Sequence, residues 1–200
     1  MPVTLEPYAS DRHDEARVAE LIYESDPEMN RLVYGAKPVE VIRKLLCIPE
    51  SYFVPETLRC AMLDGQLAGV VVVYPTSKME EIDKLAGQGF MKALGMFAFV
   101  KKLFLFMKME KMLGGTIDDD GLYIHTLCVN SALRSAGIGS EIIRLLAEEN
   151  EKMYLYVNAA NEKAIRFYER NGFRRVHRGE MRHAGKTYAE YLMERSDGDA

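Results

Sequence analysis

The segment that most constrains this chain is a glycine turn, Arg134-Ser135-Ala136-Gly137-Ile138-Gly139-Ser140. An apolar run typical of a β-strand precedes it at residues 122–129, and a run typical of an amphipathic helix follows it from Ser140. A chain that turns from strand to helix through glycines exposes backbone N–H groups at the positive end of the helix dipole. The turn therefore predicts a binding site for a phosphate or pyrophosphate, and with it a nucleotide-like cofactor.

Two common phosphate-binding loops do not fit this turn. A Walker loop has Lys-Ser or Lys-Thr directly after its glycines, and this turn has neither. A dinucleotide-binding loop has a third glycine, where this chain has Ile142. What remains is Arg-x-x-Gly-x-Gly between a strand and a helix. The alternative interpretation is an ordinary turn that uses glycines only for their backbone freedom.

The residues downstream carry a second motif. A short β-rich run at 153–157 is followed by the pattern Asn-x-x-Ala-x-x-x-Tyr-x-x-x-Gly-Phe, which is formed by Asn161, Ala164, Tyr168, Gly172 and Phe173. In their order and separation, the two motifs resemble those of the GCN5-related N-acetyltransferase (GNAT) family. The close resemblance covers roughly residues 120–175, and the pair of motifs is far more specific than either alone.

The periodicity of the sequence predicts an α/β fold with a mixed central sheet flanked by helices, in the order of elements that the resemblance implies. Asp64-Gly65 and Ala184-Gly185 predict two hairpin turns, and Ser10 or Asp11 is the expected N-cap of the first helix. The predicted strands are 3–7, 58–63, 66–74, 122–129, 153–157, 173–182 and 186–194, and the predicted helices are 11–24, 39–47, 140–151 and 161–171.

Composition sets further bounds. Two hundred residues with 48% hydrophobic content suit a single domain over 1–200, with a flexible tail at 196–200. A net charge of −4 argues against a nucleic-acid partner. Cys47, Cys60 and Cys128 are widely spaced, which predicts neither a disulfide framework nor a metal site. The N-terminus lacks the apolar core of a signal peptide, so we expect a cytoplasmic protein.

Residues 75–120 form a predicted helical insertion between the third and fourth strands, where the family has a short connection. Met and Phe side chains dominate 90–113, but five lysines interrupt them, which argues against a membrane span. Three interpretations remain open: a helix or helix pair packed on the domain, a lid or wall of the acceptor pocket, and a dimer contact or membrane-surface helix. The acidic run at 118–120 lacks the spacing of a calcium loop and is expected to be a solvated loop.

The resemblance implies that acetyl-CoA is the cofactor and also which residues hold it. Arg134 and the backbone amides of Ser135, Ala136, Gly137, Ile138, Gly139 and Ser140 would contact its phosphates. A backbone N–H at or near Val129, in the segment Leu127-Cys128-Val129, would polarise the thioester carbonyl. Asn158 and Asn161 would bind the pantetheine region, and Asn161 is also the expected N-cap of the last helix.

Two residues are candidates for the proton transfers. Tyr168 matches the family's tyrosine and would protonate the departing thiolate, and it too would contact the cofactor; the alternative is a tyrosine that only packs in the core. His125 lies four residues before Val129 and would take the proton of the attacking amine, directly or through a water. The alternative for His125 is a histidine bonded within the sheet or lining the pocket.

Together these features predict an acetyl-CoA-dependent N-acetyltransferase that transfers the acetyl group directly to a primary amine, with a small molecule as the expected acceptor. A protein N-terminus or lysine is the alternative acceptor. Transfer of a longer acyl group and a non-catalytic acyl-CoA-binding sensory module also remain open. The family resemblance makes a homodimer the default assembly.

Overall fold

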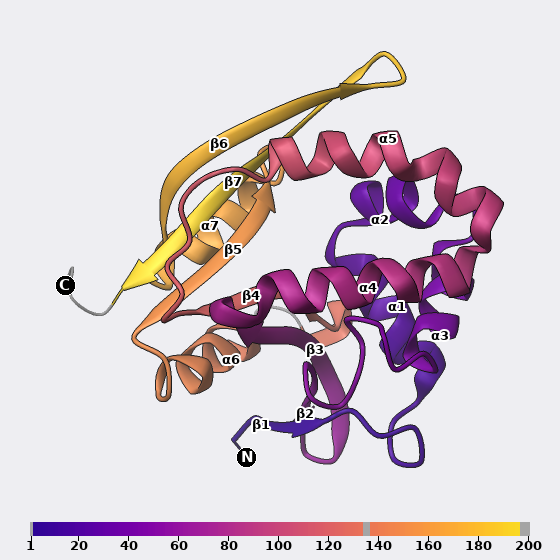
Figure 1. The fold of residues 1–200 in the computed structure, drawn as a ribbon. Helices are drawn as coiled ribbons and strands as arrows, with labels where there is room; N and C mark the ends of the chain where they lie inside the picture. Colours follow the sequence, from indigo (N-terminus) through magenta and orange to yellow (C-terminus); the bar gives the residue numbers. More distant parts are fainter. Residues whose placement is uncertain (1, 134–136, 197–200) are drawn as a thin grey trace.

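The computed structural model describes residues 2–133 and 137–196. Within them, seven strands form one mixed sheet in the order β1-β2-β3-β4-β5-β7-β6 (Figure 1). Every neighbouring pair is antiparallel except β4 and β5, which run parallel. The strands are β1 (Thr4–Pro7), β2 (Leu58–Leu63), β3 (Gln66–Pro75), β4 (Leu122–Val129), β5 (Lys152–Asn158), β6 (Arg174–His183) and β7 (Lys186–Ser196).

Helices cover both faces of the sheet and enclose two large apolar cores, and a third, small cluster of Leu105, Met112 and Met181 joins α5 to β6. In the first core, the five helices α1 through α5 pack against one face of the sheet. In the second, α6 and α7 pack against the other face (Figure 1). This arrangement confirms the α/β fold with helices on a mixed sheet. The helices are α1 (Glu15–Ser25), α2 (Pro27–Tyr34), α3 (Pro38–Leu46), α4 (Met79–Leu94), α5 (Met96–Met112), α6 (Ile138–Ala147) and α7 (Glu162–Arg170), with short 3-10 turns η1 (Thr76–Lys78) and η2 (Ser131–Leu133).

The start of α1 differs from the prediction. The helix begins at Glu15, and Asp14 caps it by accepting hydrogen bonds from the N–H groups of Ala16 and Arg17 at 3.0 and 3.3 Å. The predicted caps were wrong because the preceding segment folds into a turn, in which the N–H groups of residues 12 and 13 both donate to Ala9 O. Asp26 caps α2, a helix of eight residues that the sequence did not predict.

Both predicted hairpin turns are confirmed. Asp64 and Gly65 have φ angles of 53° and 77°, and Ala184 and Gly185 have φ angles of 48° and 79°. Positive φ at both central residues gives the turn a twist that matches the strands it joins. Ala184 adopts this left-handed conformation without the freedom of glycine, so the β6–β7 turn is the more strained of the two.

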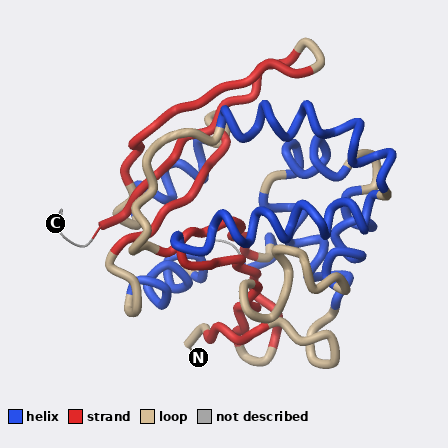
Figure 2. Tube along the Cα trace, viewed as in Figure 1, coloured by secondary structure: helices blue, strands red, loops and turns tan. Residues whose placement is uncertain are grey.

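The insertion between β3 and β4 is a pair of packed helices, as one of the three interpretations expected. The break between α4 and α5 falls at Gly95, which has a φ of 82°. The C-terminal end of α5 lies against the β6–β7 hairpin (Figure 2). A Cβ at Gly179 of β6 would lie 1.8 Å from Met112 O, so only glycine permits this approach.

Two lysines of α5 bind backbone carbonyls on either side of it. Lys102 Nζ donates to Leu32 O of α2 at 2.8 Å, and Lys108 Nζ donates to Arg182 O of β6 at the same distance. The helix therefore bridges α2 and the hairpin across one face of the sheet (Figure 1).

The outer face of α5 is apolar and exposed. Phe97 and Phe104 are 74% and 65% exposed, with Lys101 and Lys108 lying over their rings. This face continues over Met96, Val100, Leu103 and Met107. Among the described helices, none combines the length and the hydropathy that crossing a membrane requires.

Candidate active site

The sheet opens between β4 and β5. These parallel strands pair only at Leu122–Met153, Tyr123–Tyr154 and Ile124–Leu155. Beyond those pairs, β4 continues to Val129 and β5 continues to Asn158, but the two no longer form a ladder with each other. Strand β7 stays paired with β5 through Asn158. The carboxyl ends of two neighbouring parallel strands therefore diverge, as they do where ligands bind in α/β sheets.

A β-bulge places His125 at the start of this opening. In the ladder between β3 and β4, Val73 pairs with Ile124 and Val72 pairs with Thr126, so His125 is the extra residue. A bulge bends its strand and changes the direction of the side chain it carries, and bulges are frequent beside active sites. The divergence of β4 from β5 begins at this residue.

Backbone pairing fixes the direction of the Val129 N–H. The N–H of Asn130 donates to Ala68 O at 2.8 Å, while Val129 lies opposite Gly69. In an antiparallel ladder this pattern makes Val129 a member of a non-hydrogen-bonded pair, whose own N–H and C=O point away from the partner strand. The Val129 N–H therefore points away from β3, to the side where β5 diverges. Of its neighbours, Leu127 borders the second core and Cys128 is buried in the first.

The glycine turn leads into α6 as the sequence predicted. Gly137 has a φ of 77° and occupies the N-cap position, and no side chain of the described residues caps α6. A Cβ at Gly139 would lie 2.9 Å from the Phe167 ring, so this glycine lets α6 approach α7. Ile138 is buried in the second core and Ser140 is exposed. Arg134, Ser135 and Ala136 lie outside the described residues.

The two predicted asparagines lie where β5 ends: Asn158 is its last residue, and Asn161 follows it. Asn161 is the N-cap of α7, as predicted: its Oδ1 accepts a hydrogen bond from the Ala164 N–H at 3.1 Å. Asn158 Oδ1 accepts from the Ala160 N–H at 3.0 Å, and its Nδ2 donates to Asp26 Oδ2 at 3.4 Å. Asn158 therefore ties the end of β5 to the junction of α1 and α2, on the side of the first core.

His125 lies among tyrosines. Its ring stacks on Tyr52 with centroids 4.3 Å apart, and the rings of Tyr74 and Tyr123 each lie 6.3 Å away. Its Nδ1 is 2.9 Å from Thr126 Oγ1. Burial lowers the pKa of His125 to about 4, so the imidazole is neutral at physiological pH. If Nδ1 donates to Thr126, Nε2 is left as a proton acceptor.

Tyr168 lies on the other side of the sheet. It packs in the second core between Phe167 and Phe173, with ring centroids at 5.1 and 5.5 Å. Burial, together with a smaller contribution from Cys128, raises the pKa of its phenol well above the usual value. The phenol is therefore protonated at physiological pH and can donate a hydrogen bond. His125 and Tyr168 approach β4 from opposite faces of the sheet.

A buried carboxylate that the sequence analysis missed lies on β7. Glu190 is 6% exposed and pairs with Asn158 across the β5–β7 ladder. Among the described residues, no donor or cation contacts its side chain. Burial, together with like-charge repulsion from Asp26 and Glu28, raises the pKa of Glu190 to about 8.

One signal in the sequence points to Glu190. Residues 188, 190 and 192 share one face of β7 because side chains alternate along a strand, and Leu192 on that face is fully buried. A glutamate at an inward position of a strand is unusual and marks a candidate site. Glu180, also on the hairpin, is exposed and pairs with Arg178 at 2.9 Å instead.

The tyrosines around His125 form a cluster with an acid at each end. We call Tyr52, Tyr74, Tyr123 and Tyr156, together with His125, the tyrosine cluster. Tyr52 donates to Asp83 Oδ1 of α4 at 2.7 Å, and Asp83 is exposed. Burial raises the pKa of Tyr123, and Tyr156, Asp83 and Glu190 raise it further. The cluster therefore lies within electrostatic reach of Asp83 on the outside and Glu190 on the inside.

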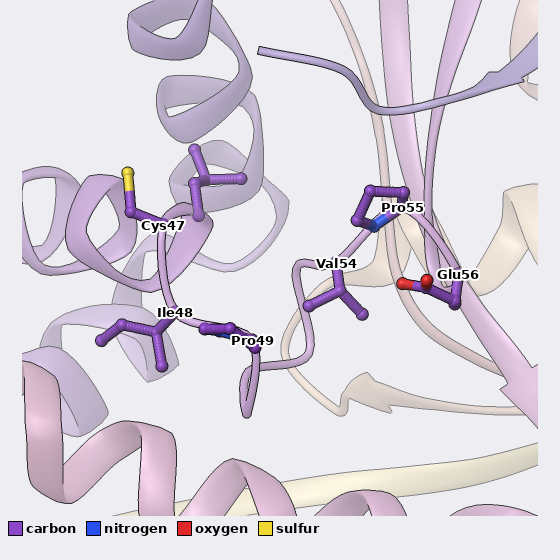
Figure 3. Close-up of a pocket in the computed structure, with 7 residues that line it drawn as sticks. Cys47, Ile48, Pro49, Val54, Pro55 and Glu56 are labelled. Atoms are coloured by element: carbon purple, nitrogen blue, oxygen red, sulfur yellow. The ribbon is translucent and has the colours of Figure 1, made fainter.

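Other features of the surface lie apart from this opening. A hollow between α3 and β2 is lined by residues 46–49 and 54–56, and no described residue of the predicted site lines it (Figure 3). Within 2–133 and 137–196, no three His, Cys, Asp or Glu side chains are grouped as metal ligands would be. Asp118 and Asp120 instead pair with Lys152, at 2.8 and 3.2 Å.

Comparison with known proteins agrees with this geometry. The N-acetyltransferase of Staphylococcus aureus Mu50 superposes with a TM-score of 0.62 at 17% identity, over 94% of this chain and 99% of that one. A protein of Corynebacterium glutamicum ATCC 13032, described as "histone acetyltransferase HPA2 and related acetyltransferase", superposes with a TM-score of 0.57 at 18% identity, over 98% of this chain and 97% of that one. A GNAT acetyltransferase of Elizabethkingia anophelis with acetyl-CoA bound gives 0.52 at 14%, over 97% of both chains.

At these identities, the solved structures establish the shared fold. No curated relative matches the sequence at a significant level. The model of the acetyltransferase (GNAT) family matches residues 19–173, which is most of the chain and includes the β4–β5 opening, the glycine turn and α7. This chain belongs to the acetyltransferase (GNAT) family.

Proposed function

We propose that this protein transfers an acetyl group from acetyl-CoA directly to a primary amine of a small molecule. The observation that carries the proposal is the opening between β4 and β5, with the Val129 N–H directed to it and α6 beginning beside it at the left-handed Gly137. Acyl transfer to an amine needs a donor for the carbonyl oxygen, a site for the phosphates and a path for two protons. The opening offers a candidate for each.

The residues present fit acetyl-CoA as the cosubstrate. A helix that starts at a left-handed glycine, as α6 does at Gly137, presents N–H groups and a positive dipole to a pyrophosphate. Residues 134–140 would hold the phosphates, and Asn158 and Asn161 at the end of β5 would bind the pantetheine arm. Acetyl-CoA supplies the acetyl group as a thioester, which is reactive enough for direct transfer to an amine.

In the proposed mechanism, this chain's own groups stabilise the negative charge on the thioester oxygen and transfer two protons. The Val129 N–H donates to the thioester oxygen as negative charge develops on it. The nitrogen–carbon bond forms while the carbon–sulfur bond breaks, and the proton lost from the amine passes to His125 Nε2, directly or through a water. Tyr168 donates its phenolic proton to the leaving sulfur. No covalent enzyme intermediate is required.

The insertion supports a small acceptor. Asp83 and Phe90 of α4 contact Tyr52 from the loop before β2, and Tyr156 donates to Leu113 O and Gly114 O at 2.7 and 3.0 Å. Both ends of the insertion therefore join the tyrosine cluster and wall the acceptor side. An aromatic wall of this kind suits a small amine better than a folded protein.

Titration calorimetry with acetyl-CoA, followed by thiol-release assays over a panel of alkylamines, amino acids and aminoglycosides, tests this proposal. We expect acetyl-CoA to bind and thiol release to depend on one class of amine. Binding without turnover on any small amine would contradict the small-molecule acceptor. No binding at all would contradict the proposed function itself.

A further inference from the structure

We propose that the acceptor carries a second cationic group, which Glu190 binds in the tyrosine-lined acceptor site while a separate nitrogen is acetylated. The inference rests on the proposed function and adds a substrate class to it: diamines, or amines that carry another permanent positive charge. Three observations support it: Glu190 is buried without a cation partner among the described residues, aromatic rings lie near it, and it lies on β7, across the opening from Val129 and His125 of β4.

Glu190 lacks a cation of its own. It is 6% exposed, and no described residue forms a hydrogen bond or ion pair with its carboxylate. The groups near it supply no cation in the described part of the chain: Asp26 is itself an acid, which accepts from the N–H groups of residues 28 and 29 and from Asn158, and Lys186 is paired with Glu28. A buried carboxylate is costly unless something neutralises it, and an ammonium group of a ligand would do so.

The tyrosine cluster, like Glu190, favours a positively charged ligand. The faces of aromatic rings attract cations, most strongly where water is excluded. Tyr74 and Tyr123 are 3% and 7% exposed, and no described residue hydrogen-bonds their phenol oxygens. Tyr123 is within electrostatic reach of both Glu190 and Asp83. A cation that entered past Asp83 would meet ring faces and phenol oxygens before reaching Glu190.

The position of Glu190 separates the bound charge from the reacting nitrogen. Glu190 lies on β7, opposite Asn158 of β5, whereas Val129 and His125 lie on β4 across the opening. The nitrogen that attacks must be neutral and ends as an amide, so it cannot remain as a charge partner for a carboxylate. A second ammonium keeps its charge throughout, and it would keep Glu190 paired before and after transfer.

Steady-state kinetics with matched acceptors test the inference. We would compare straight-chain diamines from 1,3-diaminopropane to 1,6-diaminohexane with the monoamines of equal carbon number, at saturating acetyl-CoA. We expect the best diamine to exceed its monoamine in kcat/KM by about tenfold or more. E190Q should remove that advantage through KM, because it removes the charge and keeps the shape. Glu180 is an exposed glutamate of the same hairpin, so E180Q should leave kcat/KM unchanged for both the diamine and the monoamine.

The outcomes are distinguishable from failure of the proposed function. Equal values for diamines and monoamines, unaffected by E190Q, would overturn this inference while leaving an active N-acetyltransferase. A loss of kcat in E190Q that is equal for both acceptors, with KM unchanged, would also overturn it, because Glu190 would then act on the reacting nitrogen. Absence of acetyl-CoA binding and of turnover would reject the proposed function instead.

A second measurement needs no variant, and it decides the matter if E190Q does not fold. Because the pKa of Glu190 is raised, an ammonium that binds there should displace a proton near neutral pH. Calorimetry of 1,4-diaminobutane binding to the CoA-loaded protein, in buffers of different ionisation enthalpy, measures that proton. We expect release of a substantial fraction of one proton with the diamine and little with butylamine. Equal release, or none, would contradict the inference.

Discussion

At the scale of the residue, Tyr168 is the position where chemistry and packing are most easily separated. Tyr168→Phe keeps the ring between Phe167 and Phe173 and removes only the phenol. Because a positioned general acid contributes on the order of 10²–10⁴ in rate, we expect kcat to fall about 100-fold with little change in the KM for acetyl-CoA. Thiol-release kinetics check this, and unchanged kcat would assign Tyr168 to the core alone.

Glu190 makes stability depend on pH. Its pKa is about 8 when folded and near 4.5 otherwise, so the folded state holds this proton over a wider pH range. The free energy of unfolding should therefore fall as pH rises from about 4.5 to about 8, by about 1.4 kcal/mol for each pKa unit. E190Q should be more stable than the parent at pH 8.5 and equal to it near pH 4. Denaturant titrations at both values decide this, and parallel curves would contradict it.

At the scale of the element, the two faces of α5 predict opposite outcomes for the same substitution. Phe106 packs on Phe90 and Phe99 with ring centroids 5.9 and 5.8 Å away, while Phe104 on the outer face is 65% exposed. Phe106→Ala should lower the free energy of unfolding by about 2–4 kcal/mol, and Phe104→Ala should change it by less than about 0.5 kcal/mol. Equal effects in thermal unfolding would mean that the packing of α5 is not as described.

Two helical glycines provide a matched pair for the start of α6. Gly87 in α4 has open space around a Cβ, whereas a Cβ at Gly139 would lie 2.9 Å from the Phe167 ring. Gly87→Ala should stabilise the protein by about 0.5–1 kcal/mol, because alanine favours the helix. Gly139→Ala should displace the first turn of α6 and weaken acetyl-CoA binding. Calorimetry on both variants tests this, and equal affinities would mean that the turn does not depend on this approach.

Elements that carry a local signal, either a regular period or a turn or cap residue, could be predicted from the sequence. Features that are short or that depend on distant neighbours could not. The hairpin at Asp64-Gly65, strand β4 and the cap at Asn161 each carry a local signal, and all three are as predicted. Helix α2 spans barely two turns, so its period is too short to recognise. Glu190 carries a local signal, as a glutamate at an inward position of β7, but its place beside Asn158 depends on the pairing of β7 with β5, which no local pattern reveals.

At the scale of the whole molecule, elements from distant parts of the chain converge on one opening in the sheet. The divergence of β4 and β5 provides it, α6 and α7 border it on one face, and the insertion with the β6–β7 hairpin closes the other (Figure 1). The acidic acceptor side and the α6 terminus lie on opposite faces of the sheet. A cationic amine and an anionic cofactor would therefore approach the Val129 N–H from opposite sides, each toward complementary charge.

Hydrogen–deuterium exchange with and without acetyl-CoA tests the central claim, that the β4–β5 opening is the cofactor site. We expect acetyl-CoA to slow exchange in peptides that cover residues 125–129 and 137–140, because their amides face or border the opening. Peptides that cover residues 46–49, which line the hollow of Figure 3, and that stop before Tyr52 of the tyrosine cluster should be unchanged. Protection at that hollow, with none at 125–129 and 137–140, would contradict the account.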